Sequence, residues 1–271
     1  MVFPISDDNR DRTMFPYVNI VLIAINIFVF VVLQGMGANE KFTMAFSTVP
    51  KEIITGKDES GDVVAKVQTV TGQTEVVKIG KLEPLPFGMS VYITLLTSMF
   101  MHGSLMHIGG NMWFLWIFGD NIENDLGRVR YLAFYLLTGV LASLTHVFVS
   151  ASGDAAYIPS LGASGAISGV MGGYLVLHPR RQVTVLLFRF VTQVPGFVAV
   201  GLWFVFQIVS SLQALGGSGD GVAYGAHIGG VIAGAALVKV FTLGLPQNRP
   251  LTETRGPASY GRPRETDRYY G

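Results

Sequence analysis

The sequence predicts an all-α polytopic membrane protein in which six transmembrane helices form a bundle. Half of the 271 residues are apolar and only 14% are charged, whereas soluble domains carry roughly 25% charged residues. The apolar residues also gather in separate runs, several of them about 20 residues long, which is the length of a membrane-spanning helix. Composition and patterning therefore agree on the fold class.

The composition also excludes several kinds of site. The formal net charge is +1 and no basic stripe is present, so we expect no nucleic-acid partner. The chain has no cysteine, which excludes disulfides, thiol nucleophiles and zinc–thiolate centres. The lipid bilayer is the partner that the composition indicates.

The first transmembrane helix is expected at 17–35. Residues 1–16 before it are polar, and we place them in the cytoplasm. The run itself contains 19 residues without a charge, enough to cross a bilayer. No A-x-A-like cleavage site follows, so we expect an uncleaved helix that also directs insertion.

A long polar loop follows at 36–90, on the outer side. Within it, 44–54 is amphipathic and is expected to lie at the membrane interface as a helix. The β-branched runs 63–70 and 74–79 flank Thr71-Gly72-Gln73, which predicts a small β-hairpin inside an insertion at 57–83. The sequence assigns no function to this insertion.

Five further runs complete the predicted bundle. We expect spans at 91–118, 130–150, 161–177, 197–215 and 222–243. The remaining residues, 244–271, are rich in Pro, Gly, Arg and Tyr, and we expect a disordered cytoplasmic tail.

The positive charges predict the orientation. All 12 arginines fall in the N-terminal segment, the turns at 119–130 and 178–194, and the C-terminal tail, which share one side if there are six spans. Such segments are cytoplasmic by the positive-inside rule, and the rule governs long loops such as the first one only weakly. Both termini are therefore predicted to be cytoplasmic, and we expect a prokaryotic plasma (inner) membrane.

The stretch at 158–174 contains a serine, Ser164, within Gly162-Ala-Ser-Gly165. Glycine on both sides lets the backbone bend and lets other groups approach the hydroxyl closely, as a nucleophile requires. The alternative is structural, because Gly165, Gly169 and Gly173 recur every fourth residue, as in tightly packed membrane helices. This stretch alone leaves both interpretations open.

Polar side chains within spans are costly and therefore indicate candidate sites. His107 and Asn111 lie on one helical face, where two hydrogen-bond donors can stabilise a developing oxyanion. A metal site is the alternative, although no carboxylate in the spans completes a three-ligand set. His102 lies off that face, and we expect it to brace a loop. Three polar residues in the spans have no patterned neighbours. We expect each to make an interhelical hydrogen bond or to lie at the membrane interface: Asn26, His146 and Gln207.

His227 lies near the start of the sixth run, and Gly230 and Gly234 follow on the same helical face. A glycine-lined face allows close packing against the glycines of the fourth span. The fourth and sixth spans run in the same direction, so Ser164 and His227 both come near the outer side. Close packing would then bring the hydroxyl to the imidazole, giving a nucleophile and a general base without an acidic member.

The pattern resembles the rhomboid intramembrane serine proteases over about 15–243. The resemblance rests on four separated motifs in the family's order: His102-x4-His107-x3-Asn111, Glu123 with Gly127, Gly162-Ala-Ser-Gly165, and Ala226-His227 with Gly230 and Gly234. It implies that Ser164 is the nucleophile and His227 the base. His107, Asn111 and the Ser164 backbone N–H would form the oxyanion hole, with His102 as a supporting residue.

Two departures from the family pattern bear on the site. Many members have Trp-Arg where this chain has Ile93-Thr94, and some carry an aromatic residue, stacked on the base, where this chain has Ser168. Neither residue performs chemistry, so the departures concern how the first loop is anchored and how the base is held.

The resulting hypothesis is that 17–243 is a serine endopeptidase domain that cleaves the transmembrane segments of single-span membrane proteins, without a cofactor or metal. Two alternatives remain. One is a catalytically inactive protein of the same architecture that binds membrane clients. The other is a small transporter that uses His102, His107 and His227, although the two halves show no internal repeat.

Overall fold

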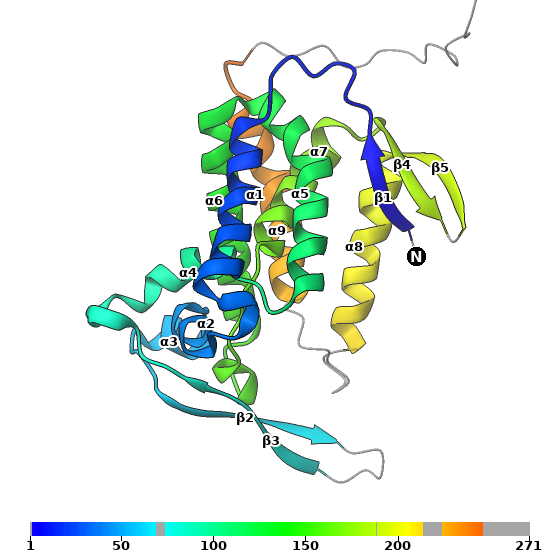
Figure 1. Ribbon diagram of the computed structural model, residues 1–271. Coiled ribbons are helices and arrows are strands. Elements are labelled where there is room, and N and C mark those ends of the chain that lie inside the picture. Colours follow the sequence, from blue (N-terminus) through cyan, green and yellow to red (C-terminus); the bar gives the residue numbers. More distant parts are fainter. Residues whose placement is uncertain (1, 69–73, 188, 214–223, 246–271) are drawn as a thin grey trace, which may run out of the picture.

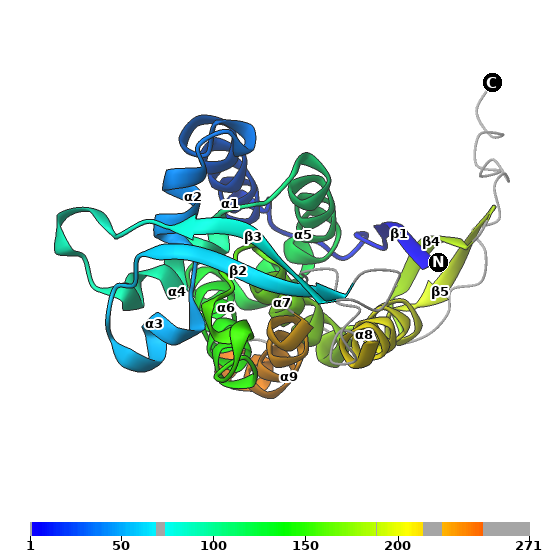
Figure 2. The ribbon, with the colours of Figure 1, turned by 90° about the horizontal axis from the view of Figure 1, so that it is seen from below.

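The computed structural model describes residues 2–68, 74–187, 189–213 and 224–245. A helical bundle dominates it, with the long axes of the helices roughly aligned (Figure 1). Helix α7 lies at the centre and contacts its neighbours on several sides (Figures 1 and 2). The bundle consists of α1 (Tyr17–Phe28), α5 (Leu105–Leu126), α6 (Arg128–Val149), α7 (Ser164–Leu177), α8 (Gly196–Gln213) and α9 (Tyr224–Phe241).

Among the residues that the structure describes, two helices, α6 and α9, are long and apolar enough to cross a membrane by themselves. The bent pair Val91–Phe100 and α5 raises that number to three if it counts as one span. Shorter apolar helices occupy Tyr17–Leu33, where α1 continues as a π-helix (Val29–Leu33), together with Ser164–Leu177 and Gly196–Phe206. The bundle core is aromatic, with fully buried Phe118, Tyr131, Phe134, Tyr135 and Tyr174.

The second predicted span, 91–118, is a bent pair of helical segments rather than one continuous helix. Val91–Ile93, α4 (Thr94–Thr97) and Ser98–Phe100 form one short helical arm, and α5 leaves it at an angle of 80°. The break has a local cause, because Ser104 is extended and its hydroxyl accepts a hydrogen bond from the His107 N–H at 3.1 Å. This N-cap, three residues before His107, sets the start of α5 at Leu105 and so fixes where that imidazole points.

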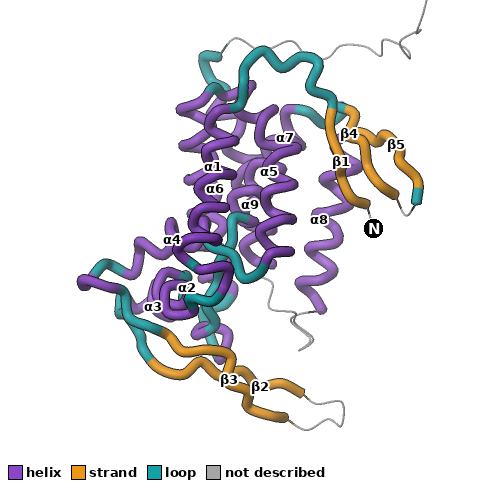
Figure 3. The backbone as a smooth tube through the Cα atoms, in the orientation of Figure 1, coloured by secondary structure: helices purple, strands orange, loops and turns teal. Residues whose placement is uncertain are grey.

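The first loop contains two short helices, α2 (Glu40–Phe46) and α3 (Pro50–Thr55), instead of one helix over 44–54. Thr48, between them, pairs with Ser160 through two backbone hydrogen bonds of 2.8 and 2.9 Å. Beyond α3, β2 (Gly61–Gln68) and β3 (Thr74–Leu82) pair antiparallel and project away from the bundle (Figure 3). The predicted turn at 71–73 lies outside the described residues.

A three-stranded antiparallel sheet lies beside α8 and was not predicted (Figures 1 and 2). It joins β1 (Val2–Asp7) to the hairpin of β4 (Gln182–Leu187) and β5 (Phe190–Pro195), in the order β1-β4-β5. The all-α prediction is wrong here, because the segment 1–16 and the turn at 178–194 supply strands. Val183 and Val185 are fully buried, so the sheet shares the core of the bundle.

Polar contacts fasten the N-terminal segment to this end of the bundle. Arg181 is 5% exposed and donates to Asp11 (2.5 Å), to the Asp8 carbonyl (3.0 Å) and to Asn121. Asp7 accepts from Tyr174 at 3.0 Å, and burial, with the nearby Asp120 carboxyl, raises the pKa of Asp7 to about 7. The N-terminal segment is thus a structural part of the domain.

Candidate active site

Ser164 begins α7, and the backbone before it has an unusual conformation. Gly162 has φ +130°, which L side chains rarely adopt, and a Cβ built there would meet His107 Cε1 and Nε2 at 3.0 Å. The Gly162 N–H donates to the Ser98 carbonyl at 2.9 Å, which anchors the turn. Glycine is therefore required at 162, both for the backbone conformation and for the approach of His107.

The structure brings Ser164 and His227 together. The distance between Ser164 Oγ and His227 Nε2 is 2.8 Å, a normal hydrogen bond across 63 positions of sequence. His227 is 8% exposed and comes from the first turn of α9. A serine hydroxyl bonded to an imidazole is the arrangement that general-base activation of a nucleophile requires.

His107 lies next to the same point. The Gly103 N–H donates to His107 Nδ1 at 3.3 Å, so a neutral ring carries its proton on Nε2. This Nε2 is the atom beside Gly162, and a Cβ at Gly162 would also lie 3.5 Å from Ser164 Oγ. A hydrogen-bond donor is thus directed toward the space next to the serine.

Asn111 lies one helical turn beyond His107 on α5. It is 8% exposed, and its Nδ2 has no hydrogen-bond partner within the described part of the chain. An unsatisfied buried amide costs about 1–3 kcal/mol, so such groups are uncommon unless they serve a purpose. A buried donor one turn from His107 on the same helix suits a site that binds an oxyanion.

His102 is fully buried, but its ring is not a hydrogen-bonding brace. Neither ring nitrogen has a partner among the residues that the structure describes, and the ring meets His107 edge-on at 5.1 Å between centroids. Its backbone is held instead, because Gln34 accepts from the His102 N–H (2.9 Å) and donates to the His102 carbonyl (3.1 Å). Gln34 was not predicted from the sequence, because it lies at the end of an apolar run without a patterned neighbour.

The predicted glycines pack closely, but not all as expected. A Cβ on Gly230 would lie 2.2 Å from the Gly165 carbonyl oxygen, and one on Gly234 would lie 1.9 Å from that of Gly169. The Cα hydrogens of Gly165 and Gly169 face α6 instead, where added Cβ atoms would meet Ala142 at 2.8 Å and Thr138 at 2.4 Å. Gly165 and Gly169 therefore let α7 approach α6, whereas Gly172 of α7 (where an added Cβ would lie 2.2 Å from the Val231 carbonyl oxygen) and Gly230 and Gly234 of α9 let α7 and α9 approach each other.

Two other predicted polar residues, Glu123 and Asn26, bond to the backbone of α1. Glu123 is buried and accepts hydrogen bonds from the N–H groups of Val18 (3.0 Å) and Asn19 (2.7 Å), so it caps the start of α1. Asn26 donates to the Leu22 carbonyl of its own helix at 2.8 Å. His146 lies in the last turn of α6, and the side chain of Gln207 lies outside the described residues.

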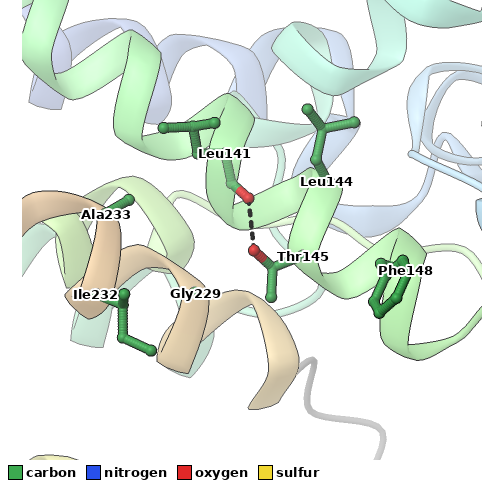
Figure 4. A pocket seen from close by; sticks show the side chains of 7 residues that line it. All are labelled: Leu141, Leu144, Thr145, Phe148, Gly229, Ile232 and Ala233. Carbon is green, nitrogen blue, oxygen red and sulfur yellow. Dashed lines mark hydrogen bonds between the residues drawn. The ribbon is translucent and has the colours of Figure 1, made fainter. Parts of the chain in front are cut away.

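An open groove between α6 and α9 is separate from the site (Figure 4). Its single hydroxyl, on Thr145, donates to the Leu141 carbonyl at 2.8 Å, and neither Ser164 nor His227 lines it. Such a surface suits contact with lipid rather than chemistry. Its lining residues are Leu141, Leu144, Thr145, Phe148, Gly229, Ile232 and Ala233.

Comparison with known proteins identifies the family. The rhomboid domain matches residues 90–243, more than half of the chain. Rhomboid protein 1, mitochondrial, of Saccharomyces cerevisiae is 34% identical over 148 residues, covering 52% of this chain and 40% of that protein. The human presenilin-associated rhomboid-like protein, mitochondrial, is 38% identical over 105 residues, covering 38% and 27%.

One bacterial relative is named as a protease. Rhomboid protease GluP of Bacillus subtilis is 30% identical over 179 residues, covering 65% of this chain and 31% of that protein. The matches thus span less than half the length of each of these relatives. Two of the three are mitochondrial, which does not fit the predicted prokaryotic plasma membrane. The chain is an integral membrane protein and belongs to the rhomboid family.

Proposed function

We propose that this chain is an intramembrane serine endopeptidase that cleaves transmembrane segments of other membrane proteins. The observation that carries the proposal is the 2.8 Å hydrogen bond between Ser164 Oγ and His227 Nε2. Similarity to a bacterial relative named as a protease supports the same reaction class.

The reaction begins when Ser164 Oγ attacks the carbonyl carbon of the scissile peptide bond. His227 Nε2 accepts the hydroxyl proton, and the carbonyl oxygen becomes an oxyanion. When the C–N bond breaks, His227 returns the proton to the leaving amine and an acyl-enzyme remains. Water then attacks this ester, His227 accepts a proton from it, and the carboxylic acid product leaves with Ser164 regenerated.

The oxyanion is stabilised by donors from two helices. His107 contributes Nε2–H, because its Nδ1 already accepts from Gly103. Asn111 contributes Nδ2–H, and the Ser164 N–H lies at the N-terminus of α7, where the helix dipole favours negative charge. Loss of one such donor typically lowers kcat by about 10²–10³.

The bundle arrangement favours the six-span topology, and we propose that α1 and α5 to α9 all cross the membrane. Both termini then lie on the arginine-rich side. The substrates are expected to be single-span proteins. The substrate helix must unwind locally before its peptide bonds can reach Ser164. Helices with Gly or Pro within the span unwind most readily.

The test uses purified protein with a fluorophosphonate probe and a panel of single-span reporter proteins. Labelling and cleavage should both disappear in Ser164→Ala, and cleavage in His227→Ala. Thr145→Ala is the control, because this hydroxyl lies in the α6–α9 groove. Labelling that survives Ser164→Ala would sink the assignment, and folded wild type that neither labels nor cleaves would indicate a client-binding protein instead.

A further inference from the structure

The side chain at position 168 of α7 does not supply an aromatic contact to the imidazole of His227. At this position, where some family members carry a stacking aromatic residue, this chain has Ser168, whose hydroxyl donates to the Ser164 carbonyl at 2.6 Å. A Cβ on Gly230 would lie 2.9 Å from Ser168 Cβ, so α9 packs directly onto this residue. The short side chain makes room for α9 but offers no ring to the imidazole.

Two aromatic rings do lie against His227. Trp203 of α8 has its ring centroid 5.9 Å from that of the imidazole at an interplanar angle of 40°, and Tyr224 lies edge-on at 6.2 Å. Tyr224 is on α9 itself, three residues before His227, and moves with it. Of these two rings, Trp203 is the one that contacts the imidazole from a different helix.

Trp203 is itself restrained on another side. Its ring lies 6.2 Å from that of Phe114 on α5, the helix that carries His107 and Asn111. Aromatic pairs in tilted or offset arrangements at 4.5–7 Å between centroids attract one another. The chain of contacts from α5 through Trp203 to His227 therefore joins the oxyanion donors to the base.

We propose that Trp203 is the positioning residue for His227, supplying the aromatic contact that Ser168 does not. An imidazole on one flexible side chain can rotate away from the serine. A ring packed against it restricts that rotation and keeps Nε2 directed at Ser164 Oγ. This inference rests on the proposed function, because it assigns Trp203 a part in the same reaction.

The kinetic test compares Trp203→Leu, which removes the ring, with Trp203→Phe, which keeps one. Trp116→Leu is the matched control, because Trp116 is 57% exposed on the outside of α5. Trp203→Leu should lower kcat about tenfold to a hundredfold with KM within about twofold, and Trp203→Phe should recover most of the loss. An unchanged kcat, a change confined to KM, no recovery in the Phe variant, or an equal loss in Trp116→Leu would each overturn the inference.

A second measurement needs no activity. The protein is labelled with ¹³Cε1-histidine, and the His227 signal is identified among the five histidines by its loss in His227→Gln. Ring current from Trp203 should displace this signal, and the displacement should disappear in Trp203→Leu but not in Trp116→Leu. A signal that does not respond to Trp203→Leu refutes the contact. If wild type shows no Ser164-dependent turnover, the proposed function fails while the NMR result still decides whether Trp203 holds the imidazole.

Discussion

Gly230→Ala tests whether helix packing, rather than side-chain chemistry alone, assembles the site. The added Cβ would lie 2.2 Å from the Gly165 carbonyl oxygen, which is backbone and cannot swing aside. Ordinary contact begins at 3.4 Å, so α9 and α7 must separate locally by about 1.2 Å. His227 lies one turn before Gly230 on the same helix and must move with it.

The expected effect follows from the Ser164–His227 hydrogen bond. A 2.8 Å bond lengthened by about 1 Å passes beyond 3.6 Å, where it no longer counts as a hydrogen bond. A displacement of this size typically lowers kcat by about 10²-fold. The folded state should also lose a few kcal/mol, as roughly 1–3 kcal/mol is usual for overpacking.

The assay measures cleavage of a single-span reporter in proteoliposomes, with thermal unfolding in parallel. Gly225→Ala is the matched control, because it lies on the same helix and its Cβ would meet its nearest neighbour, His146 Cα, at 3.5 Å. That variant should retain activity within about twofold, helped by the better helix propensity of Ala. Wild-type kcat in Gly230→Ala, or an equal loss in Gly225→Ala, would refute the reasoning.

Three further predictions address the donors, the turn and the N-terminal segment. Asn111→Ala should lower kcat about 10²–10³-fold with little change in KM, because an oxyanion donor acts in the transition state; steady-state kinetics decide this. Gly162→Ala should lower the free energy of unfolding by about 1–3 kcal/mol, since Ala is strained at φ +130° and its methyl meets His107; thermal unfolding and cleavage rate measure the two effects. Asp7→Asn should abolish a pH dependence of stability: the folded state raises the pKa of Asp7 from 3.8 to about 7, so the carboxyl stabilises at low pH and that contribution is lost as pH rises to 7. At pH 8 the free energy of unfolding of Asp7→Asn should exceed that of wild type by up to about 4 kcal/mol, because a rise in pKa from 3.8 to about 7 corresponds to roughly 1.4 kcal/mol per pKa unit.

Each of these has a result that contradicts it. For Asn111→Ala it is a rise in KM with kcat unchanged, which would make the amide a substrate-binding group. For Gly162→Ala it is wild-type stability and rate. For Asp7→Asn it is a stability profile between pH 4 and 8 parallel to that of wild type, in which case the carboxyl is not held protonated by its surroundings.

The sequence by itself determined the bundle helices and the chemical groups of the site. Apolar runs of span length mark where the bundle helices lie, because a bilayer constrains helix length directly. The fixed spacing of His107 and Asn111 is also local, since a helix places residues four apart on one face. Ser164 became a candidate nucleophile through its combination with His107, Asn111 and His227, because its glycine-flanked stretch alone is equally typical of helix packing.

The tertiary structure decided what depends on contacts between distant segments. β1 forms because 178–194 supplies a partner strand, and no pattern in six residues predicts pairing with a hairpin about 180 positions away. The break before α5 depends on a hydroxyl cap at Ser104, and the contact of Trp203 with His227 depends on how α8 packs. Helix packing decided which glycines face α6 and which face α9. The sequence shows where a glycine lies but not which neighbouring helix approaches it.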